Sequence, residues 1–390
     1  MELLGGLIEG FGGAVTGLAL TLIAFLFVLT LVVFVHEYGH FIVARWCGVK
    51  VRVFSIGFGN ELFGWYDRKG TRWRFSAIPL GGYVKFEGDA NAASSPDFDA
   101  VRAMSEEERK GSIFHKSVGQ RAAIVAAGPA ANFIMAITVF AAMAYFNGRQ
   151  ILLPRIETVQ AASAAERAGF QPGDLVVSID GRIIDSFTDM QRIVSINAGE
   201  KLKVTVDRGG TPVELTAVPD LREVPSPLGA QKVGVLGVQA SNGAAAWRTE
   251  HYSLPGALRA GVSETWQVVA QTYHYVGRLI AGKESTEQLS GPIRIAEVSG
   301  QVARLGGLVG LLNLAAVLSV SIGLINLVPI PMLDGGHLLF YGIEAVRGRP
   351  LSERAQEFGF RLGLMLVAVL MLLVTWNDVM HIGARFGLAR

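Results

Sequence analysis

Four long apolar segments dominate the pattern of hydrophobic and polar positions along this chain. The first, Leu18–Val35, is interrupted only by two threonines. As a helix at 1.5 Å per residue it would cover about 27 Å, close to the hydrocarbon thickness of a bilayer. Three more segments follow, at Ala122–Phe146, Leu308–Ile330 and Leu362–Trp376. The last is short enough to form a buried helix instead, but its charged flanks favour a membrane span, so the pattern predicts four transmembrane helices.

The composition agrees with a membrane protein. The chain is 51% hydrophobic and 17% charged, with a mean hydropathy of +0.39, whereas soluble chains carry roughly 25% charged residues. A net charge of +2 gives no strong basic field, so we expect no nucleic-acid partner. The single cysteine, Cys47, excludes an intrachain disulfide and a cysteine-based zinc cluster, and we interpret it as a small buried apolar side chain.

The distribution of basic residues predicts the orientation in the membrane. Residues 1–35 contain no Lys or Arg, so the positive n-region of a cleaved signal peptide is missing. Residues 45–121 contain thirteen basic residues, and the loop between the third and fourth spans adds Arg347, Arg349 and Arg354. By the positive-inside rule both loops are cytoplasmic, and the segment 147–306 lies on the opposite side.

The segments between the spans have different patterns. Residues 47–90 have β-branched and aromatic residues broken by Gly- and Asp-containing turns, which predicts strands. Their Phe, Trp and Tyr content is typical of a membrane interface. The region is therefore either a small soluble hairpin domain or a β-sheet that dips to the membrane. Residues 91–119 are polar and are interpreted as a connector.

A small β-rich domain is predicted in the long segment after the second span. The stretch "AASAAERAGFQPGDLVVSIDGRII", with Gly173 and Asp174 leading into a strand, resembles the PDZ family. PDZ domains bind extended peptides by adding a strand to an exposed sheet edge. We expect this domain at 152–240 and a linker at 241–306. Within the linker, 261–282 has helical periodicity and aromatics, so an interfacial amphipathic helix and a core helix both remain open.

The first apolar segment ends in the sequence "HEYGH", which has metal-site spacing. His36 and His40 are four residues apart, so a helix places them on one face. H-E-x-x-H on a helix is typical of zinc hydrolases, with the glutamate, here Glu37, as general base. An ionisable group inside a membrane segment costs roughly 2.5 kcal/mol or more, which makes such residues functional candidates.

A catalytic zinc has three protein ligands and one open position. The stretch "NLVPIPMLDGGH", residues 326–337, ends the third apolar segment on the same side as "HEYGH". Pro329 and Pro331 stop the helix there. Asp334 follows, and a carboxylate oxygen is an acceptable zinc ligand. Two alternatives remain open: Asp334 could cap the next helix, and His337 could be the third ligand.

Together these motifs resemble the site-2 protease family of intramembrane zinc proteases, most of all its bacterial RseP-type members. The resemblance covers nearly the whole chain in the expected order. The motifs that carry it are "HEYGH" (36–40), "FSIGFG" (54–59), "PLGGYVKFEGD" (79–89), "GPAAN" (128–132), the PDZ pattern, "SGPIRIA" (290–296) and "NLVPIPMLDGG" (326–336). One departure is that RseP-type members carry two tandem PDZ domains, whereas this chain has one Gly-Asp signature.

The resemblance implies a function and a set of roles. It implies His36, His40 and Asp334 as zinc ligands and Glu37 as the base. It also suggests that the substrate is held with help from Asn326, Pro329 and Pro331. The implied substrates are single-span membrane proteins, such as anti-sigma factors or remnant signal peptides, after another protease has shortened them.

The implied location is the bacterial inner membrane, with a periplasmic PDZ domain and the active site near the cytoplasmic face. The PDZ domain would filter substrates by size or read a new peptide C-terminus. Because a transmembrane helix hides its amides, we expect that the substrate unwinds and that an edge strand from 51–88 holds it extended.

The predicted fold class is a mainly α-helical polytopic membrane protein with four transmembrane helices, a membrane-associated β-region and an inserted small PDZ (β-rich α+β) domain. Two other functions remain open. A non-catalytic PDZ-bearing scaffold would not need an intact Glu37. A transporter with an intramembrane proton relay would show inverted repeats of its spans, and we find none. The predicted parts are the first transmembrane helix with the zinc motif (1–46), the membrane-associated β-region (47–90), the polar connector (91–119), the second transmembrane helix (120–147), the PDZ domain (152–240), the linker (241–306), the third transmembrane segment with the zinc-ligand loop (307–345) and the fourth transmembrane helix (356–380).

Overall fold

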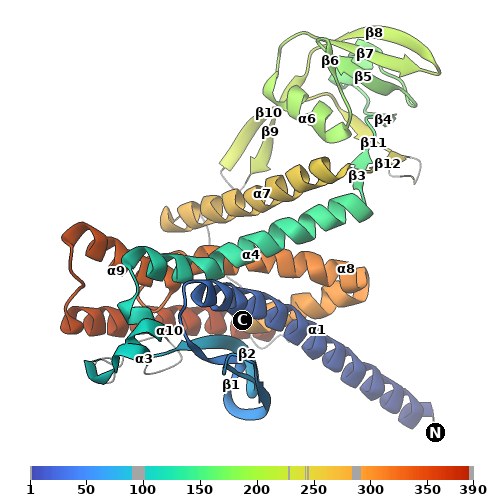
Figure 1. Cartoon of the computed structure of the whole chain (residues 1–390). Coiled ribbons are helices and arrows are strands. Elements are labelled where there is room, and N and C mark those ends of the chain that lie inside the picture. The colour runs from blue at the N-terminus through green and yellow to red at the C-terminus, as the bar shows by residue number, and fades with distance from the viewer. Residues whose placement is uncertain are drawn as a thin grey trace. The chain divides into compact units, whose positions relative to one another are not determined.

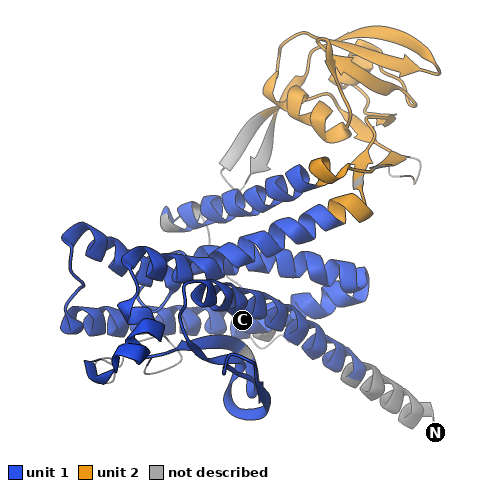
Figure 2. Ribbon diagram, viewed as in Figure 1, with its two compact units in different colours: residues 1–142, 258–390 blue, residues 143–257 orange. Residues whose placement is uncertain are grey.

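The chain divides into two compact units in a computed structural model. Residues 1–142 and 258–390 form one unit and residues 143–257 the other (Figure 2). The structure describes residues 2–89, 102–226, 229–241, 243, 246–282 and 291–385. Residues 91–101 of the predicted connector and Ser290 of the "SGPIRIA" motif lie outside these ranges.

The first unit is built mainly of helices (Figure 1). Four of its described helices have a stretch that is long and apolar enough to cross a bilayer: Thr16–Trp46, Val118–Phe146, Pro292–Asn326 and Glu353–Met380. This agrees with the four spans predicted from the hydrophobic pattern. The helices are α1 (Glu2–Trp46), α3 (Glu106–Gly111), α4 (Val118–Phe146), α7 (Leu254–Ile280), α8 (Pro292–Asn326), α9 (Asp334–Arg347) and α10 (Glu353–Arg385), with a short 3-10 turn at Ile113–His115.

Helix α8 is the centre of the helical packing. Its Ala315 packs with Val28 and Val32 of α1. Its Ala316 and Val320 pack with α4 and α7 in a second cluster. Small and β-branched residues let these helices approach closely, as is usual for helices that associate in a membrane. This packing fixes α1 and α4 beside the same central helix.

Helix α7 combines features of both interpretations offered for 261–282. It begins at Leu254 and packs Val269 into the cluster shared by α4 and α8. Beside this packed face it exposes apolar residues four residues apart, including Leu258, Val262 and Trp266. The helix is therefore both packed against its neighbours and amphipathic.

Two long strands, β1 (Val51–Tyr66) and β2 (Arg72–Phe86), form the β-region predicted at 47–90. They make one hairpin with several register shifts, so that Phe54 lies opposite both Val84 and Trp73. Residues 53–56 consequently sit between 72–75 and 82–86. In the described part of the chain, no strand pairs with the other side of 82–86, which makes this segment an edge.

The hairpin is anchored to the end of α1. Phe54, Val84 and Phe86 share a buried cluster with Phe41 and Ala44 of α1. A polar network at the hairpin turn adds to this anchor. Asp67 accepts hydrogen bonds from the Arg45 guanidinium and the Trp73 indole N–H. The sheet edge is therefore held in a fixed position relative to His36 and His40, one to two helical turns earlier in α1.

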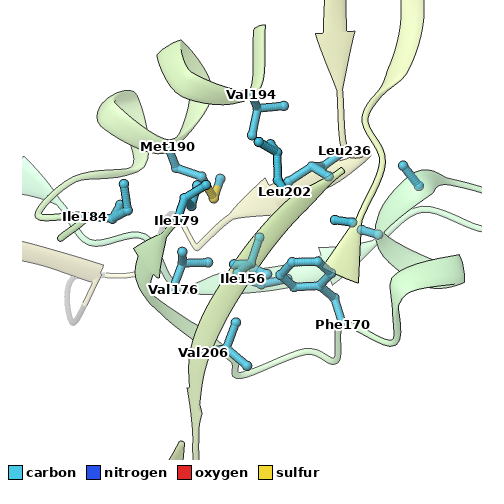
Figure 3. Close-up of a cluster of buried hydrophobic side chains, with 14 of the residues drawn as sticks. Ile156, Phe170, Val176, Ile179, Ile184, Met190, Val194, Leu202, Val206 and Leu236 are labelled. Carbon is cyan, nitrogen blue, oxygen red and sulfur yellow. The ribbon is translucent and has the colours of Figure 1, made fainter. Parts of the chain in front are cut away.

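The second unit has a four-stranded sheet in the order β6-β5-β7-β8, with helices α5 (Ala164–Ala168) and α6 (Phe187–Ile196). Figure 3 shows its core, in which Ile179 of β5 lies beside Met190 of α6, and Val176 of β5 and Val194 of α6 belong to the same cluster. A PDZ domain at 152–240 remains a prediction, although this small β-rich unit is compatible with it. The strands are β3 (Arg149–Leu152), β4 (Ile156–Val159), β5 (Leu175–Ile179), β6 (Arg182–Ile183), β7 (Leu202–Arg208), β8 (Thr211–Ala217), β9 (Asp220–Ser226), β10 (Gly229–Val235), β11 (Val238–Ala240) and β12 (Trp247–Glu250).

Candidate active site

Three side chains from α1 and α9 converge on one point. The Nε2 atoms of His36 and His40 are 3.2 Å apart. Oδ2 of Asp334 lies 3.2 Å from the first and 3.5 Å from the second. Oδ2 is buried and receives no hydrogen bond with suitable geometry. Within the described residues, this is the one group of three His, Cys, Asp or Glu side chains that could share a metal ion.

The spacing of these three atoms fits a zinc ion. Tetrahedral ligands at about 2.0–2.1 Å from zinc lie roughly 3.3 Å from one another. The three separations of 3.2, 3.2 and 3.5 Å bracket this value. Two imidazole nitrogens and one carboxylate oxygen are also a donor set that zinc accepts in catalytic sites. The residues present therefore fit the metal that the motif predicted.

Each of the three comes from a position that the local sequence explains. His36 and His40 share a face because α1 is continuous through both. Asp334 is the first residue of α9 after the turn that contains Pro329 and Pro331. Met332 in this turn has a φ of 88°, a left-handed conformation that is costly for a residue with a side chain. The strained turn places Asp334 opposite the two histidines.

Helix α4 supports both histidines from behind. Nδ1 of His40 is 2.9 Å from the carbonyl oxygen of Ile124, and Nδ1 of His36 is 3.1 Å from the side-chain nitrogen of Asn132. Gly128, between these two positions, leaves room for the His40 ring. A Cβ at 128 would lie 2.2 Å from Nε2 of His40. The "GPAAN" motif therefore provides the surface against which the histidines are oriented.

A cavity of about 280 Å³ opens onto the cluster. Its walls include His36, His40 and Asp334, together with Glu37. On another side the cavity is bounded by residues 81–84 of β2. The Glu37 side chain lies close to β2, since a Cβ at Gly82 would lie 3.2 Å from its Cγ. The predicted base therefore faces the same space as the three candidate metal ligands.

The other residues singled out by sequence lie in different places. Asn326, the last residue of α8, lines the cavity, whereas Pro329 and Pro331 are not among its lining residues. Pro331 packs against α10, where a Cβ at Gly363 would clash with its carbonyl. His337 lines the cavity outside the three-residue cluster, and its ring centroid is 5.5 Å from that of Phe360. The geometry therefore favours Asp334 over His337 as the third metal ligand.

The alternative in which Asp334 caps a helix is not what the structure shows. The residue in the capping position is Leu333, and its side chain makes no capping hydrogen bond. Asp334 is already helical, and its carboxylate is directed at the histidines. An acidic residue in the first turn is favoured by the helix dipole, so the position suits a carboxylate in any case.

Comparison with known protein families agrees with this geometry. The model of Peptidase family M50 matches residues 24–370. The chain belongs to peptidase family M50. M50 is the site-2 protease family, so the resemblance found in the sequence motifs is confirmed.

Relatives of this M50 peptidase are similar over almost their whole length. A protein of Rhizobium meliloti named "Putative zinc metalloprotease" is 47% identical over 92% of this chain and 96% of the relative. A protein of Brucella suis with the same description is 48% identical over 95% of this chain and 97% of the relative. Metalloprotease MmpA of Caulobacter vibrioides is 43% identical over 93% and 96%. This M50 peptidase is accordingly a zinc metalloendopeptidase of the site-2 type, which argues against the scaffold and the transporter.

Sequence reasoning quoted Asn132 in a motif but gave it no role. The signal was present, because an asparagine in an otherwise apolar span of this M50 peptidase needs a polar partner. The backbone contributions of Ile124 and Val84 carry no such signal. A carbonyl or an N–H is the same in every residue type, so only the folded chain shows which one reaches the site.

Proposed function

We propose that this M50 peptidase cleaves single-span transmembrane proteins within the membrane. The observation that carries the proposal is the position of the His36, His40 and Asp334 cluster. His36 and His40 belong to α1, which is long and apolar enough to span a bilayer. Asp334 follows the turn at the end of α8, a second helix of this kind. A hydrolytic site placed there suits a substrate that is itself in the membrane.

The proposed residue roles follow from the cavity. His36, His40 and Asp334 would hold zinc, which when bound acts as a Lewis acid on the scissile carbonyl and lowers the pKa of a water. Glu37 would take a proton from that water and pass it to the leaving amine. Glu37 lines the same cavity as these three side chains. Asn326, which lines the cavity, would contact the substrate.

The edge formed by 82–86 would hold the substrate in extended form. The N–H of Phe86 points away from β1, and that of Val84, two residues earlier in the strand, would point the same way, toward the cavity that Val84 lines. Residues two apart in a strand face the same side, so Gly82 would present its backbone in the same direction. At Phe86 the N–H is already bonded to the Asp89 carboxylate at 2.8 Å. The edge available to a substrate is therefore short and lies directly beside the base.

Pro329 and Pro331 would contribute to substrate binding through the shape of the turn. Both lie between Asn326 and Asp334, and neither lines the cavity. They would restrict the backbone that joins these two residues. Their proposed role is thus to keep Asn326 and Asp334 on the same side of the cavity.

The proposed location is the bacterial inner membrane, with the active site near the cytoplasmic face. The basic residues of 45–121 and of the loop that follows α9 support this orientation. The second unit would then be periplasmic. The proposed substrates are anti-sigma factors or remnant signal peptides that another protease has shortened. The bilayer is the proposed environment of both enzyme and substrate.

A periplasmic PDZ-type function is proposed for the second unit. A cavity of about 500 Å³ lies between α6 and the strand residues 233–238. Phe187, Met190 and Val194 give it an apolar wall. A groove between a helix and a strand suits an extended peptide. The unit would either read a new C-terminus there or filter substrates by size.

The test of the proposed function combines zinc content with cleavage. The purified protein and the Glu37→Gln variant are assayed on a model transmembrane peptide, with zinc measured by elemental analysis. We expect zinc in both proteins and cleavage only by the wild type. Equal cleavage by both proteins would sink the mechanism. Loss of zinc in Asp334→Ala, with retention in His337→Ala, would establish the third ligand.

A further inference from the structure

Asn132 is a buried amide whose two polar atoms are in different situations. Its side chain is inaccessible to solvent within α4. The side-chain nitrogen, as placed, lies 3.1 Å from Nδ1 of His36. The side-chain oxygen is buried and has no hydrogen-bond partner. A buried polar atom without a partner costs about 1–3 kcal/mol, so this arrangement requires an explanation.

The proposed metal site determines which ring nitrogen of His36 carries the hydrogen. A neutral imidazole that binds a metal through Nε2 keeps its proton on Nδ1. Nε2 of His36 is the atom that faces His40 and Asp334. Nδ1 is then an N–H donor, and its neighbour has to be an acceptor. An amide nitrogen is only a donor and cannot fill that role.

Turning the amide by 180° resolves the conflict. An amide has nearly the same shape in both orientations, so no neighbouring atom has to move. The side-chain oxygen then accepts from Nδ1–H of His36, and the side-chain nitrogen takes the buried position that the oxygen held. The turn removes the meeting of two donors at His36. His40 is held in the matching way, since its Nδ1 lies 2.9 Å from the carbonyl oxygen of Ile124. Both histidines would thus donate to acceptors supplied by α4.

We infer that Asn132 is a positioning residue for His36 and that its side-chain oxygen accepts the Nδ1 hydrogen of that histidine. This fixes the tautomer that leaves Nε2 free for a metal and orients the ring toward Asp334. The inference rests on the proposed metal site. Asn132 would therefore do more than fill space in α4, because orienting His36 requires its side-chain oxygen as a hydrogen-bond acceptor.

The experiment measures zinc affinity rather than cleavage. Purified variants are titrated with Zn²⁺ in competition with a fluorescent chelator at one fixed pH. Asn132→Leu has a similar volume but no acceptor, and we expect it to bind zinc about 10–100-fold more weakly. Asn132→Asp keeps an acceptor oxygen and loses the amide nitrogen, so it should retain wild-type affinity.

A matched control is available at Ser319, which bonds to the backbone of Asn132. Ser319 donates a buried hydrogen bond of 3.0 Å to the backbone oxygen of Asn132, not to its side chain. Ser319→Ala removes a buried hydrogen bond at this position and should bind zinc as the wild type does. If Asn132→Leu fails to fold, Asn132→Ala takes its place. The visible spectrum of the Co²⁺-loaded protein gives a second readout of ligand geometry.

The outcomes separate the two proposals. Wild-type affinity in Asn132→Leu, or equal weakening in the Leu and Asp variants, would overturn the role of Asn132. If His36→Ala loses zinc while Asn132→Leu does not, only this inference fails. If His36→Ala retains zinc, the proposed metal site fails as well.

Discussion

The carboxylate of Asp378 in α10 accepts a hydrogen bond of 3.0 Å from the backbone N–H of Gly291, the residue at the start of α8. The same carboxylate accepts from the N–H groups of Ile293 and Arg294. Gly291 has no side chain that could cap its own helix, and a Cβ there would lie 2.4 Å from Oδ2 of Asp378. A side chain from α10 thus caps α8, which explains the glycine of "SGPIRIA".

Replacing this cap should destabilise the helical unit. Asp378→Ala leaves three N–H groups of α8 without an acceptor, and we expect a loss of about 1–2 kcal/mol in the free energy of unfolding. Asp378→Asn keeps one acceptor oxygen and should lose less. Thermal unfolding of the purified protein in detergent measures both. The neighbouring Val379→Ala changes an exposed residue and serves as the control; an equal effect in all three variants would contradict the capping role.

Gly128→Ala should displace the His40 ring. The added methyl group would fall 2.2 Å from Nε2 of His40, and the ring is confined by its contact with Ile124. We expect zinc affinity and cleavage to fall together by at least roughly tenfold, as for other residues that orient metal ligands. The control is Ala130→Ser on an exposed position of α4. Zinc affinity is measured by chelator competition, and an unchanged value in Gly128→Ala would show that the close approach is unimportant.

Substrate binding at the edge of β2 should show a period of two residues. An ester in place of a substrate amide removes one N–H donor, at a cost of about 0.5–1.5 kcal/mol per hydrogen bond. We expect kcat/KM to fall for esters at alternate positions of an extended substrate and to change little for those between. Val84→Pro should abolish part of this pattern, whereas Val84→Ala keeps the backbone N–H and should preserve it. Equal sensitivity at every position would argue against strand addition.

The second unit should lose stability in acid through Asp174. Burial favours the neutral form of this carboxyl, but hydrogen bonds from Arg208 and from the N–H of Gln171 outweigh burial and lower the pKa of Asp174. A lowered folded-state pKa gives stability that is complete above the unfolded value of about 3.9 and is lost as the pH falls through the folded value.

Asp174→Asn should therefore be less stable than wild type at pH 6, by about 1–3 kcal/mol. This difference should shrink as the pH falls below about 4, since protonation of the wild-type carboxyl removes the same interaction. Calorimetry of the purified protein in detergent measures both. Asp185→Asn, at an exposed position, is the control. A difference that stays constant down to pH 3 would contradict the assignment.

The elements that the sequence predicted well are those set by composition and short spacing. Four apolar stretches predicted four long helices, because a helix that satisfies its own backbone is the simple solution in a membrane. The spacing of His36 and His40 predicted a shared face. The proximity of Asp334 was inferred from the motif in which it lies, and its packing beside both histidines required the folded chain.

What the sequence could not predict depends on backbone atoms and on distant partners. The start of α8 at Pro292 lies within the range interpreted as a linker, because its first turns are polar and its cap comes from Asp378. The carbonyl of Ile124 reaches His40, and the backbone of 82–84 borders the cavity, only through the packing of α4 and β2. No local pattern of residue types marks these contacts.

The separation of the cluster between α1 and α9 has a consequence for synthesis. His36, Glu37 and His40 leave the ribosome early, whereas Asp334 follows only after α8 has been made. Ligands contributed by both ends of a chain come together late, since closing so long a loop is slow and awaits the intervening helices. With zinc held by the proposed ligands, a nascent chain would carry an incomplete metal site through most of its insertion, and the site would be complete only once the fold around it is in place.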